Sequence, residues 1–439
     1  MSSRSSSIIP SAVSGSFGRR SRNRAAEGPS LTYAFACAVL PHKVHRFSKS
    51  DFRDTRILVG EGATSTVYKV LIQTPGREEA AAIKQKRLKG SWFDHDVSVE
   101  SWLQTAYLDI RIMSHDSFRR THNVVTALGY FWEPFEYTDG SPGLSPCLVL
   151  PLAMDEAPTL QHFFASLPKE GRAVGGALQF SLARDIANGL HELHSCGVVH
   201  GDLKPANILL FRETVDGPIT AKLSDFSHSF IMSDYEGGKT KNLPRYTGTP
   251  PFVTPEVRRW EREMMATGNP SHLGESGLDM PNYYACDIFS LGDILRALAT
   301  DGENLWRWLE GARHPDDVVH EFKEDDVLDH PSLYVGEIVA EVARFSFLTP
   351  HRAAAICECL EMCLQEDPEA RGTALDVRNR LDEAEVEVGP STLPRSQLAA
   401  MIQYIESSVD ASPAARNLAL SFLANLTADS DPSTVKEKP

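Results

Sequence analysis

The sequence predicts an α+β fold with a strand-rich first lobe and a helical second lobe. Between Phe52 and Leu152, short runs of apolar and β-branched residues are bounded by turn residues, which is typical of strands. Beyond Pro151 the apolar residues recur at helical spacing. Because strands come first and helices follow, the pattern indicates an α+β protein.

The first lobe is expected to contain several short strands and one helix. A helix is predicted over Glu100–Met113, where apolar residues recur every three or four positions. Turn residues at Pro75-Gly76 separate two of the strands. The predicted strands are Ile57–Val59, Val67–Ile72, Ala80–Lys84, Val124-Val125, Tyr130–Trp132 and Cys147–Leu152.

The second lobe is expected to be mainly helical. Helices are predicted over Leu178–Ser195 and Asp287–Thr300, and one more ends near Val388. The Gly/Pro/Ser-rich stretch Thr267–Met280 is predicted to be a surface insertion. Three clustered cysteines of this lobe follow a helical apolar pattern, which favours a buried helix face over a metal site; they are Cys357, Cys359 and Cys363.

Charge divides the chain into a basic start and an acidic body. Residues 1–50 carry eight Lys/Arg and one acid, so the remainder of this chain of net charge −15 carries −22. We predict a disordered basic tail over 1–50, a small lobe over 51–150, a large lobe over 151–388 and a C-terminal extension over 389–439. Two short amphipathic segments are expected in that extension, Gln397–Ser407 and Pro413–Leu426.

The same features bear on partners and location. An acidic body argues against nucleic acid as the main partner, and no apolar run approaches the roughly 20 residues that span a bilayer. Seven scattered cysteines fit a reducing compartment, so a cytoplasmic location is expected. The Ser/Arg-rich start leaves mitochondrial import as an alternative, although Pro10, Gly15 and Gly18 break any amphipathic helix there. The sequence leaves the oligomeric state open.

A glycine-containing loop joins the first two predicted strands. Gly60 and Gly62 would let backbone N–H groups approach phosphate oxygens of a nucleotide. Ser65 stands where a G-x-G-x-x-G loop has its third glycine, and Val67 follows. This pattern alone is also compatible with an ordinary hairpin turn.

A lysine ends the apolar strand that follows. Lys84 comes directly after Ala81-Ala82-Ile83. A single lysine at this position is compatible with a solvated strand end. Its functional interpretation is a ligand of the α- and β-phosphates of ATP.

The strongest chemical signal is the loop from Val199 to Leu209. It places a carboxylate, an ammonium and an amide within six positions, as Asp202, Lys204 and Asn207. Phosphoryl transfer needs these groups to accept the proton of a hydroxyl, balance charge and hold magnesium.

A second acidic residue follows 23 positions later. Asp225 lies in Leu223-Ser224-Asp225-Phe226-Ser227, after an apolar strand. An Asp at a strand end is often only a turn residue. Paired with the preceding loop, Asp225 is interpreted as the main magnesium ligand.

These motifs together resemble the eukaryotic protein kinase superfamily, and in particular fungal kinase-like proteins with an HGDLKP-type catalytic loop. The resemblance covers roughly Phe52 to Leu381. Three later landmarks agree in order: Gly248–Glu256 resembles the end of an activation segment, Cys286–Gly292 the central helix of the large lobe, and Asp367-Pro368 with Arg371 the late motif whose Arg pairs with Glu256.

The resemblance implies a two-lobed kinase fold and a set of nucleotide contacts. Leu150 would be the gatekeeper, and Pro151–Ala153 the hinge beside adenine. Val67, Ala82 and Leu209 would sandwich the adenine ring, although ordinary core positions are equally compatible with these three. Lys204 and Thr249 resemble the Ser/Thr class of kinases.

The sequence also departs from the family pattern at four positions. Asp109 stands where the helix should supply a Glu to pair with Lys84, and Glu100 lies nearby at a different offset. Ser65 and Ser227 replace loop glycines, at a cost in backbone freedom. Gly201 replaces the Arg of H-R-D, which a phosphorylated activation segment would neutralise.

The expected function is therefore a protein Ser/Thr kinase that uses ATP and Mg²⁺ and acts on a protein substrate. Asp202, Lys204, Lys84 and Asp109 would carry catalysis, and Asn207 and Asp225 would hold the metal. The first alternative is a pseudokinase, which binds ATP or serves as a scaffold, as the departures at residues 65, 109 and 227 suggest. The second is a small-molecule phosphotransferase, which would lack the landmarks at Glu256, Asp287 and Arg371.

Overall fold

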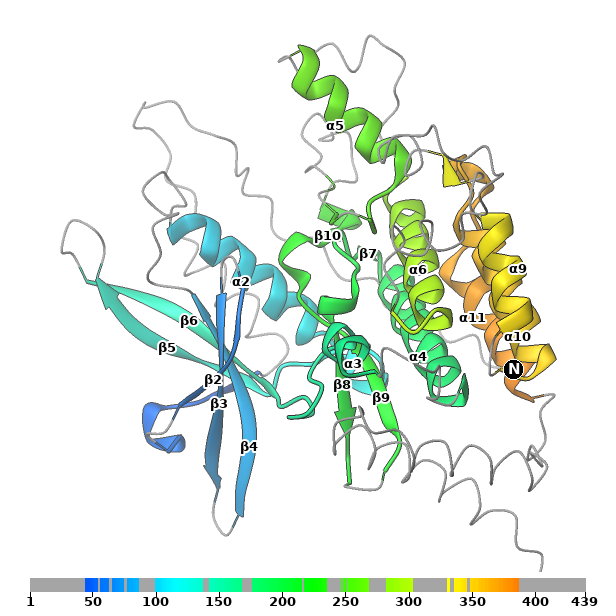
Figure 1. The fold of residues 1–439 in the computed structure, drawn as a ribbon. Coiled ribbons are helices and arrows are strands. Elements are labelled where there is room, and N and C mark those ends of the chain that lie inside the picture. The colour runs from blue at the N-terminus through cyan, green and yellow to red at the C-terminus, as the bar shows by residue number, and fades with distance from the viewer. Residues whose placement is uncertain are drawn as a thin grey trace, which may run out of the picture. The chain divides into compact units, whose positions relative to one another are not determined.

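The structure is a computed structural model in which two compact units are described (Figure 1). The first unit takes its described residues from Met1–Ala153, Glu192–Asp202 and Lys222–Thr247. The second takes them from Met154–His191, Leu203–Ala221 and Gly248–Pro439. The described residues are 44–53, 56–62, 65–74, 77–86, 99–136, 142–167, 176–214, 217–234, 246, 248–249, 251–267, 282–302, 330–331, 335–345 and 348–386.

The first unit is built on a six-stranded sheet with the strand order β1-β5-β6-β4-β3-β2. Neighbouring strands are antiparallel except β1, which runs parallel to β5. This sheet confirms the strand-rich first lobe. The strands are β1 His45–Arg46, β2 Ile57–Glu61, β3 Ser65–Thr74, β4 Arg77–Lys86, β5 Gly129–Glu136 and β6 Pro142–Pro151.

The apolar core of this unit lies on the sheet. In β3, burial alternates as a half-buried strand requires, with Val70 and Ile72 buried and Leu71 between them half-buried. Phe47 and Phe52 pack against the same core, so the sheet unit begins before residue 51. The core residues are Val70, Ile72, Ala81, Ile83, Phe131, Cys147 and Val149.

Helix α2 (Val99–Met113) packs against β6 and against the 3₁₀ helix η4 (Phe226–His228). Its buried face contains Ala106, Asp109, Ile110 and Met113, which recur at helical spacing and are at most 1% exposed. Asp109 is therefore a carboxylate on an otherwise apolar stripe.

Two further strand pairs flank the segments that contain Asp202 and Asp225. In the first unit β7 (Val198–Val199) is antiparallel to β10 (Phe230–Ile231). β8 (Ile208–Arg212) pairs with β9 (Ile219–Leu223) in a separate two-stranded sheet.

The second unit is mainly helical, as expected. α10 packs against α6, α9 and α11 (Figure 1). α6 and α10 approach closely at Gly292, where an added Cβ would lie 2.6 Å from Cβ of Cys363, so only glycine fits. The helices are α3 Leu160–Ser166, α4 Gly176–Ser195, α5 Pro255–Thr267, α6 Tyr283–Ala299, α9 Val335–Phe345, α10 Pro350–Cys363 and α11 Ala374–Val386.

One predicted strand is wrong. Val124-Val125 form no strand of the sheet; instead Val124 makes an isolated bridge with Leu223, and the N–H of Val125 donates to Leu223 O at 2.9 Å. The backbone hydrogen bonds of this segment are instead made with the chain just before Asp225, so it does not pair with a strand of the sheet. The cysteine prediction is confirmed, since Cys357, Cys359 and Cys363 are buried on α10.

Several sequence predictions fall outside the described residues. These are the tail up to residue 43, the insertion after Thr267 and both amphipathic C-terminal segments. The first compact unit also includes Glu192–Asp202 and Lys222–Thr247, which follow the strands of the sheet in the chain. None of the helices that the structure describes is long and apolar enough to cross a bilayer.

Candidate active site

The described glycines of the loop lie at the ends of the antiparallel strands β2 and β3. Gly60 pairs with Val67 in the ladder, and the N–H of Gly62 donates to Ser65 O at 2.8 Å. A Cβ added at Gly60 or Gly62 would meet its nearest atom at 3.7 or 3.5 Å, which is ordinary contact. Packing within the structure therefore does not require glycine at either position, and close approach of a ligand to the backbone would explain both.

Strand register places four predicted nucleotide contacts on one face of the sheet. Val67 pairs with Lys84, and Ala82 pairs with Leu150, in antiparallel ladders. Directly opposed residues point to the same side, as do residues two apart on one strand. Val67, Ala82, Lys84 and Leu150 are therefore neighbours.

The two remaining predicted adenine contacts are described separately. Ala153 follows β6 and is half-buried. Leu209 lies on β8 in the second unit, where it bridges to Thr159 and is half-buried.

Lys84 lies between two carboxylates. Its Nζ donates to Asp109 Oδ2 at 2.7 Å and to Asp225 Oδ1 at 2.8 Å. The other oxygen of Asp109 accepts the backbone N–H of Phe226 at 2.9 Å. The pairing of Lys84 with Asp109 that the sequence predicts is present, and Asp109 also binds the motif that contains Asp225.

Burial and charge fix the ionisation of this network. Burial would lower the pKa of Lys84, but the carboxylates of Asp109 and Asp225 raise it above its ordinary value. Burial would likewise raise the pKa of Asp225, but the Lys84 ammonium and a hydrogen bond from Ser227 hold it well below its usual range. For Asp109, burial raises the pKa against the pull of Lys84. At neutral pH the network thus presents a charged ammonium and an ionised Asp225.

The backbone around Asp225 is held in an unusual conformation. Asp225 has φ of 62°, in the left-handed region, and caps η4. Phe226 is fully buried, with its ring centroid 5.6 Å from that of His200. Ser227 does not have a positive φ, so replacing the family's glycine here causes no backbone strain.

The catalytic loop begins in the first unit, with Asp202 only 6% exposed. His200 is buried; its Nε2 lies 3.1 Å from Ser224 O, and its Nδ1 accepts the N–H of Asp202 at 3.3 Å. Gly201 has φ of +81°, and a Cβ there would lie 2.1 Å from His228 O. The backbone at Gly201 therefore leaves no room for the arginine that the family carries.

The loop continues into the second unit after Asp202. The Nζ of Lys204 donates to Thr249 Oγ1 at 2.9 Å. Asn207 is buried in the 3₁₀ helix η3 (Pro205–Asn207), which begins with the proline of the motif.

The predicted pairing of Arg371 with Glu256 is present in the second unit. Arg371 and Glu256 form a two-pronged ion pair, with Nη1–Oε1 and Nη2–Oε2 distances of 2.7 and 2.9 Å. Arg371 also donates to Ala285 O at the start of α6. Ser290 Oγ donates to Phe252 O at 2.7 Å, which joins α6 to the end of the activation segment.

One ion pair near the site has no signal in the sequence. Arg111 of α2 pairs with Asp234, at the end of the 3₁₀ helix η5 (Met232–Asp234). The two residues are 123 positions apart and belong to no motif. Glu100, the alternative partner considered for Lys84, lies in the first turn of α2, and its side chain is outside the described residues.

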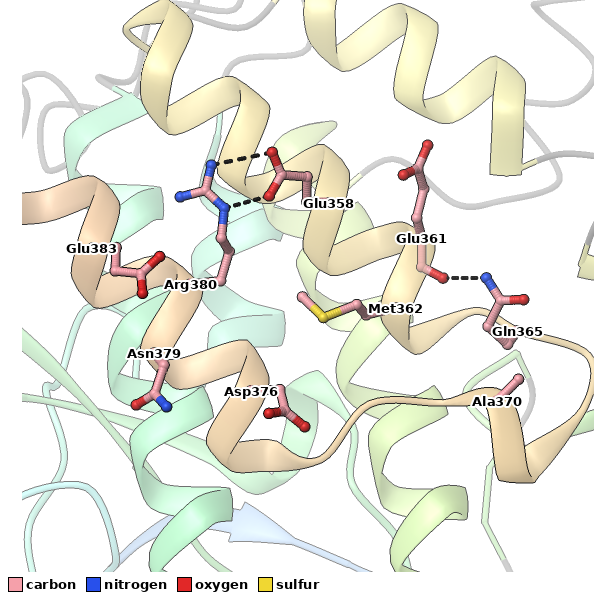
Figure 2. Close-up of a pocket in the computed structure, with 9 residues that line it drawn as sticks. All are labelled: Glu358, Glu361, Met362, Gln365, Ala370, Asp376, Asn379, Arg380 and Glu383. Atoms are coloured by element: carbon pink, nitrogen blue, oxygen red, sulfur yellow. Dashed lines mark hydrogen bonds and ion pairs between the residues drawn. The ribbon is translucent and has the colours of Figure 1, made fainter.

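A separate pocket lies between α10 and α11 (Figure 2). Its volume is about 650 Å³, and it contains none of the predicted site residues. Arg380 pairs with Glu358 across it, so part of its acidic lining is already neutralised. Its lining residues are Glu358, Glu361, Met362, Gln365, Ala370, Asp376, Asn379, Arg380 and Glu383.

The strand-rich first lobe, the helical second lobe, the Lys84 network and the Asp202 loop are together the features of a protein kinase domain. A family model described as protein kinase domain matches residues 54–380, and the chain belongs to that family.

Three relatives show how far the similarity extends. The chain is 30% identical over 215 residues to serine/threonine-protein kinase 17A of Oryctolagus cuniculus, covering 48% of this chain and 45% of that one. It is 31% identical over 183 residues to the interferon-induced, double-stranded RNA-activated protein kinase of Rattus norvegicus, covering 40% and 30%. It is 25% identical over 274 residues to serine/threonine-protein kinase RAD53 of Saccharomyces cerevisiae, covering 62% and 28%. The match thus spans less than half the length of each of these relatives.

Proposed function

We propose that this chain is a protein kinase that transfers the γ-phosphoryl group of ATP to Ser or Thr hydroxyls of protein substrates. The observation that carries the proposal is the network of Lys84, Asp109 and Asp225. An ammonium and a carboxylate are held in their charged forms by contacts of 2.7 and 2.8 Å. Phosphoryl transfer depends on such pre-positioned charges rather than on covalent chemistry by the protein.

ATP is assigned to the residues that share a face of the sheet. Lys84 would bind the α- and β-phosphates, and the backbone of Gly60 and Gly62 would approach them. Val67 and Ala82 would contact the adenine ring, with Leu150 and Ala153 at its edge. Apolar side chains with a few polar backbone groups suit a planar base.

Magnesium fits the chemistry of the two metal-binding candidates. Asp225 is ionised and its side chain is 41% exposed, so it can offer a hard oxygen ligand. Asn207 is the asparagine of the loop motif, and its amide oxygen is the second protein ligand that the resemblance implies for magnesium. Bound there, the ion would neutralise phosphate charge.

Asp202 is assigned the role of proton acceptor. The hydroxyl oxygen of the substrate forms the new bond to the γ-phosphorus while its proton passes to Asp202. The bond from that phosphorus to the bridging oxygen breaks, and ADP takes the electron pair. Lys204 would stabilise the charge that develops on the transferred group. Its hydrogen bond to Thr249 supports the Ser/Thr class.

Two departures that would favour a pseudokinase leave the described geometry undisturbed. Asp109 reaches Lys84 despite its shorter side chain, and Ser227 takes a backbone conformation open to any residue. These observations favour the catalytic proposal over a scaffold.

The test is transfer from γ-labelled ATP to a panel of Ser-, Thr- and Tyr-containing peptides and proteins. We expect label on Ser or Thr that requires magnesium and is abolished by chelation. Asp202→Asn is the matched variant, since it removes the proton acceptor and keeps the shape. Transfer by Asp202→Asn at the wild-type rate, or label that appears without a divalent ion, would refute the proposal.

A further inference from the structure

Helix α2 is held at two neighbouring positions by charged contacts. Asp109 binds Lys84 and the N–H of Phe226, while Arg111, two residues later, pairs with Asp234. Residues two apart on a helix are separated by about 200° around its axis. α2 is therefore held by contacts on two sides. Only the contacts of Asp109 involve the Lys84 network, whereas the Arg111–Asp234 pair does not.

The Arg111–Asp234 contact has the geometry of a strong pair. The two terminal nitrogens of the Arg111 guanidinium donate to the two carboxylate oxygens of Asp234, with Nη1–Oδ2 at 2.5 Å and Nη2–Oδ1 at 2.9 Å. Arg111 is only 5% exposed, and its guanidinium carbon lies 5.8 Å from the ring centroid of Tyr107. A two-pronged, largely desolvated contact of this kind is stronger than an exposed ion pair.

The residues just before Asp234 are paired with the strand that leads into the catalytic loop. β10 pairs with β7 through Phe230 opposite Val199 and Ile231 opposite Val198. The N–H of Met232 donates to Gly197 O at 2.8 Å, two residues before Asp234. The chain from Asp225 to Asp234 thus follows the strand that leads into His200 and Asp202.

The catalytic loop lacks the arginine that the family has before the catalytic Asp, because residue 201 is glycine. Gly201 carries no charge, and the carbonyl of His228 occupies the space where a side chain would begin. A phosphate on the segment would therefore find no arginine at residue 201. Asp234 is a carboxylate that the sequence itself supplies, and it already meets an arginine on α2.

We propose that Arg111 and Asp234 form a built-in latch that positions α2, and with it Asp109, without phosphorylation of the activation segment. Both are positioning residues, since they act on Lys84 through Asp109. The inference rests on the proposed function only for its kinetic readout. Its structural readout, the order of α2 against Phe226, does not need catalysis.

The experiment compares full-length chains that have been treated with phosphatase and shown to be phosphate-free by mass spectrometry. The variants are Asp234→Asn, Arg111→Gln, the double substitution, and Asp234→Glu, which keeps the carboxylate. Arg119→Gln is the control, because Arg119 forms an exposed pair with Asp116 in the same unit. Hydrogen exchange at the Phe226 amide is followed beside kcat and KM for ATP.

We expect Asp234→Asn and Arg111→Gln each to lower kcat/KM by roughly 10-fold or more, the value of a charged hydrogen bond. The double substitution should be little worse than either single one. The Phe226 amide should exchange faster while amides of β3 and β4 keep their protection. Asp234→Glu should recover much of the loss, and Arg119→Gln should match the wild type.

Wild-type rates and exchange in Asp234→Asn would overturn the inference and leave the proposed function intact. Equal acceleration of exchange across β3 and β4 would also overturn it, by showing general destabilisation. If the wild type transfers no phosphate but Asp234→Asn still frees the Phe226 amide selectively, the latch stands and the proposed function fails.

Discussion

Asp109 shows how one side chain can take the place of a longer one. A carboxylate on an apolar helix face costs free energy unless its oxygens are matched. Here Oδ2 accepts from Lys84 and Oδ1 accepts from the N–H of Phe226. The shorter side chain suffices because α2 packs directly against η4.

The first prediction concerns this pair. Asp109→Ala and Lys84→Ala should impair phosphoryl transfer to a similar extent, because each removes the same buried contact between the two side chains and leaves the other with one partner fewer. The double variant should be little worse than either single one, which a double-mutant cycle on kcat/KM will measure. Additive losses would show that the two residues act separately. A large loss in Glu100→Ala would instead show that Glu100 is the partner.

The second prediction contrasts two glycines. Gly201→Ala should destabilise the fold by about 1–2 kcal/mol for the left-handed backbone, with an added cost from the close carbonyl of His228. Gly60→Ala should leave the melting temperature within about 2 °C of the wild type, because its Cβ meets only ordinary contacts. It should instead raise KM for ATP. Thermal unfolding and steady-state kinetics separate these outcomes, and equal melting temperatures for both variants would contradict them.

Among single residues, the sequence predicts a functional role for those whose type and order form a motif. Lys84, Asp202, Asn207 and Asp225 follow one another in an order that chemistry explains, so they could be named without a structure. Asp234 could not, because Asp is common in loops and nothing in the sequence points to a partner 123 positions away. The missing arginine at Gly201 was visible, but the carbonyl that excludes it was not.

Among the elements, periodicity predicted those that are long enough to have a period. Strands β2 to β6 and helices α2, α4 and α6 lie where apolar spacing places them, whereas the two-residue strand β1 falls in a stretch predicted to be a disordered tail. The strand predicted at Val124-Val125 is absent from the sheet, because this segment bonds to Leu223 instead of to a neighbouring strand. Likewise, periodicity could not reveal that Glu192–Asp202 and Lys222–Thr247 group with the first unit.

The third prediction concerns how α5 and α6 are joined to the chain after α10. The Arg371 side chain is fully buried and Glu256 is its two-pronged partner. Glu256→Ala should destabilise the second unit by about 3–5 kcal/mol, the cost of leaving a buried charge without its partner. Arg259→Ala is the matched control, because Arg259 and Glu366 form an exposed pair worth at most about 1 kcal/mol. Chemical denaturation measures both, and similar losses for the two variants would contradict the assignment.

For the whole molecule, we expect the position of α2 that supports catalysis to form without any phosphate added to the chain. α2 is held by Asp109 on one side and by Arg111 with Asp234 on the other. Gly201 offers no charge for an added phosphate to neutralise. We therefore predict that activity does not require phosphate on the hydroxyl residues between Asp225 and Glu256, which include Ser229, Ser233, Thr240 and Thr247.

The most direct test is the initial rate of γ-phosphate transfer by the full-length chain after phosphatase treatment, with mass spectrometry confirming a phosphate-free segment. We expect magnesium-dependent transfer to Ser or Thr within about twofold of the untreated rate, and none from Asp202→Asn, because fixed charges already hold the site. Loss of most activity on treatment, restored by rephosphorylation, would contradict the account and show that another basic residue has taken over the role of the missing arginine.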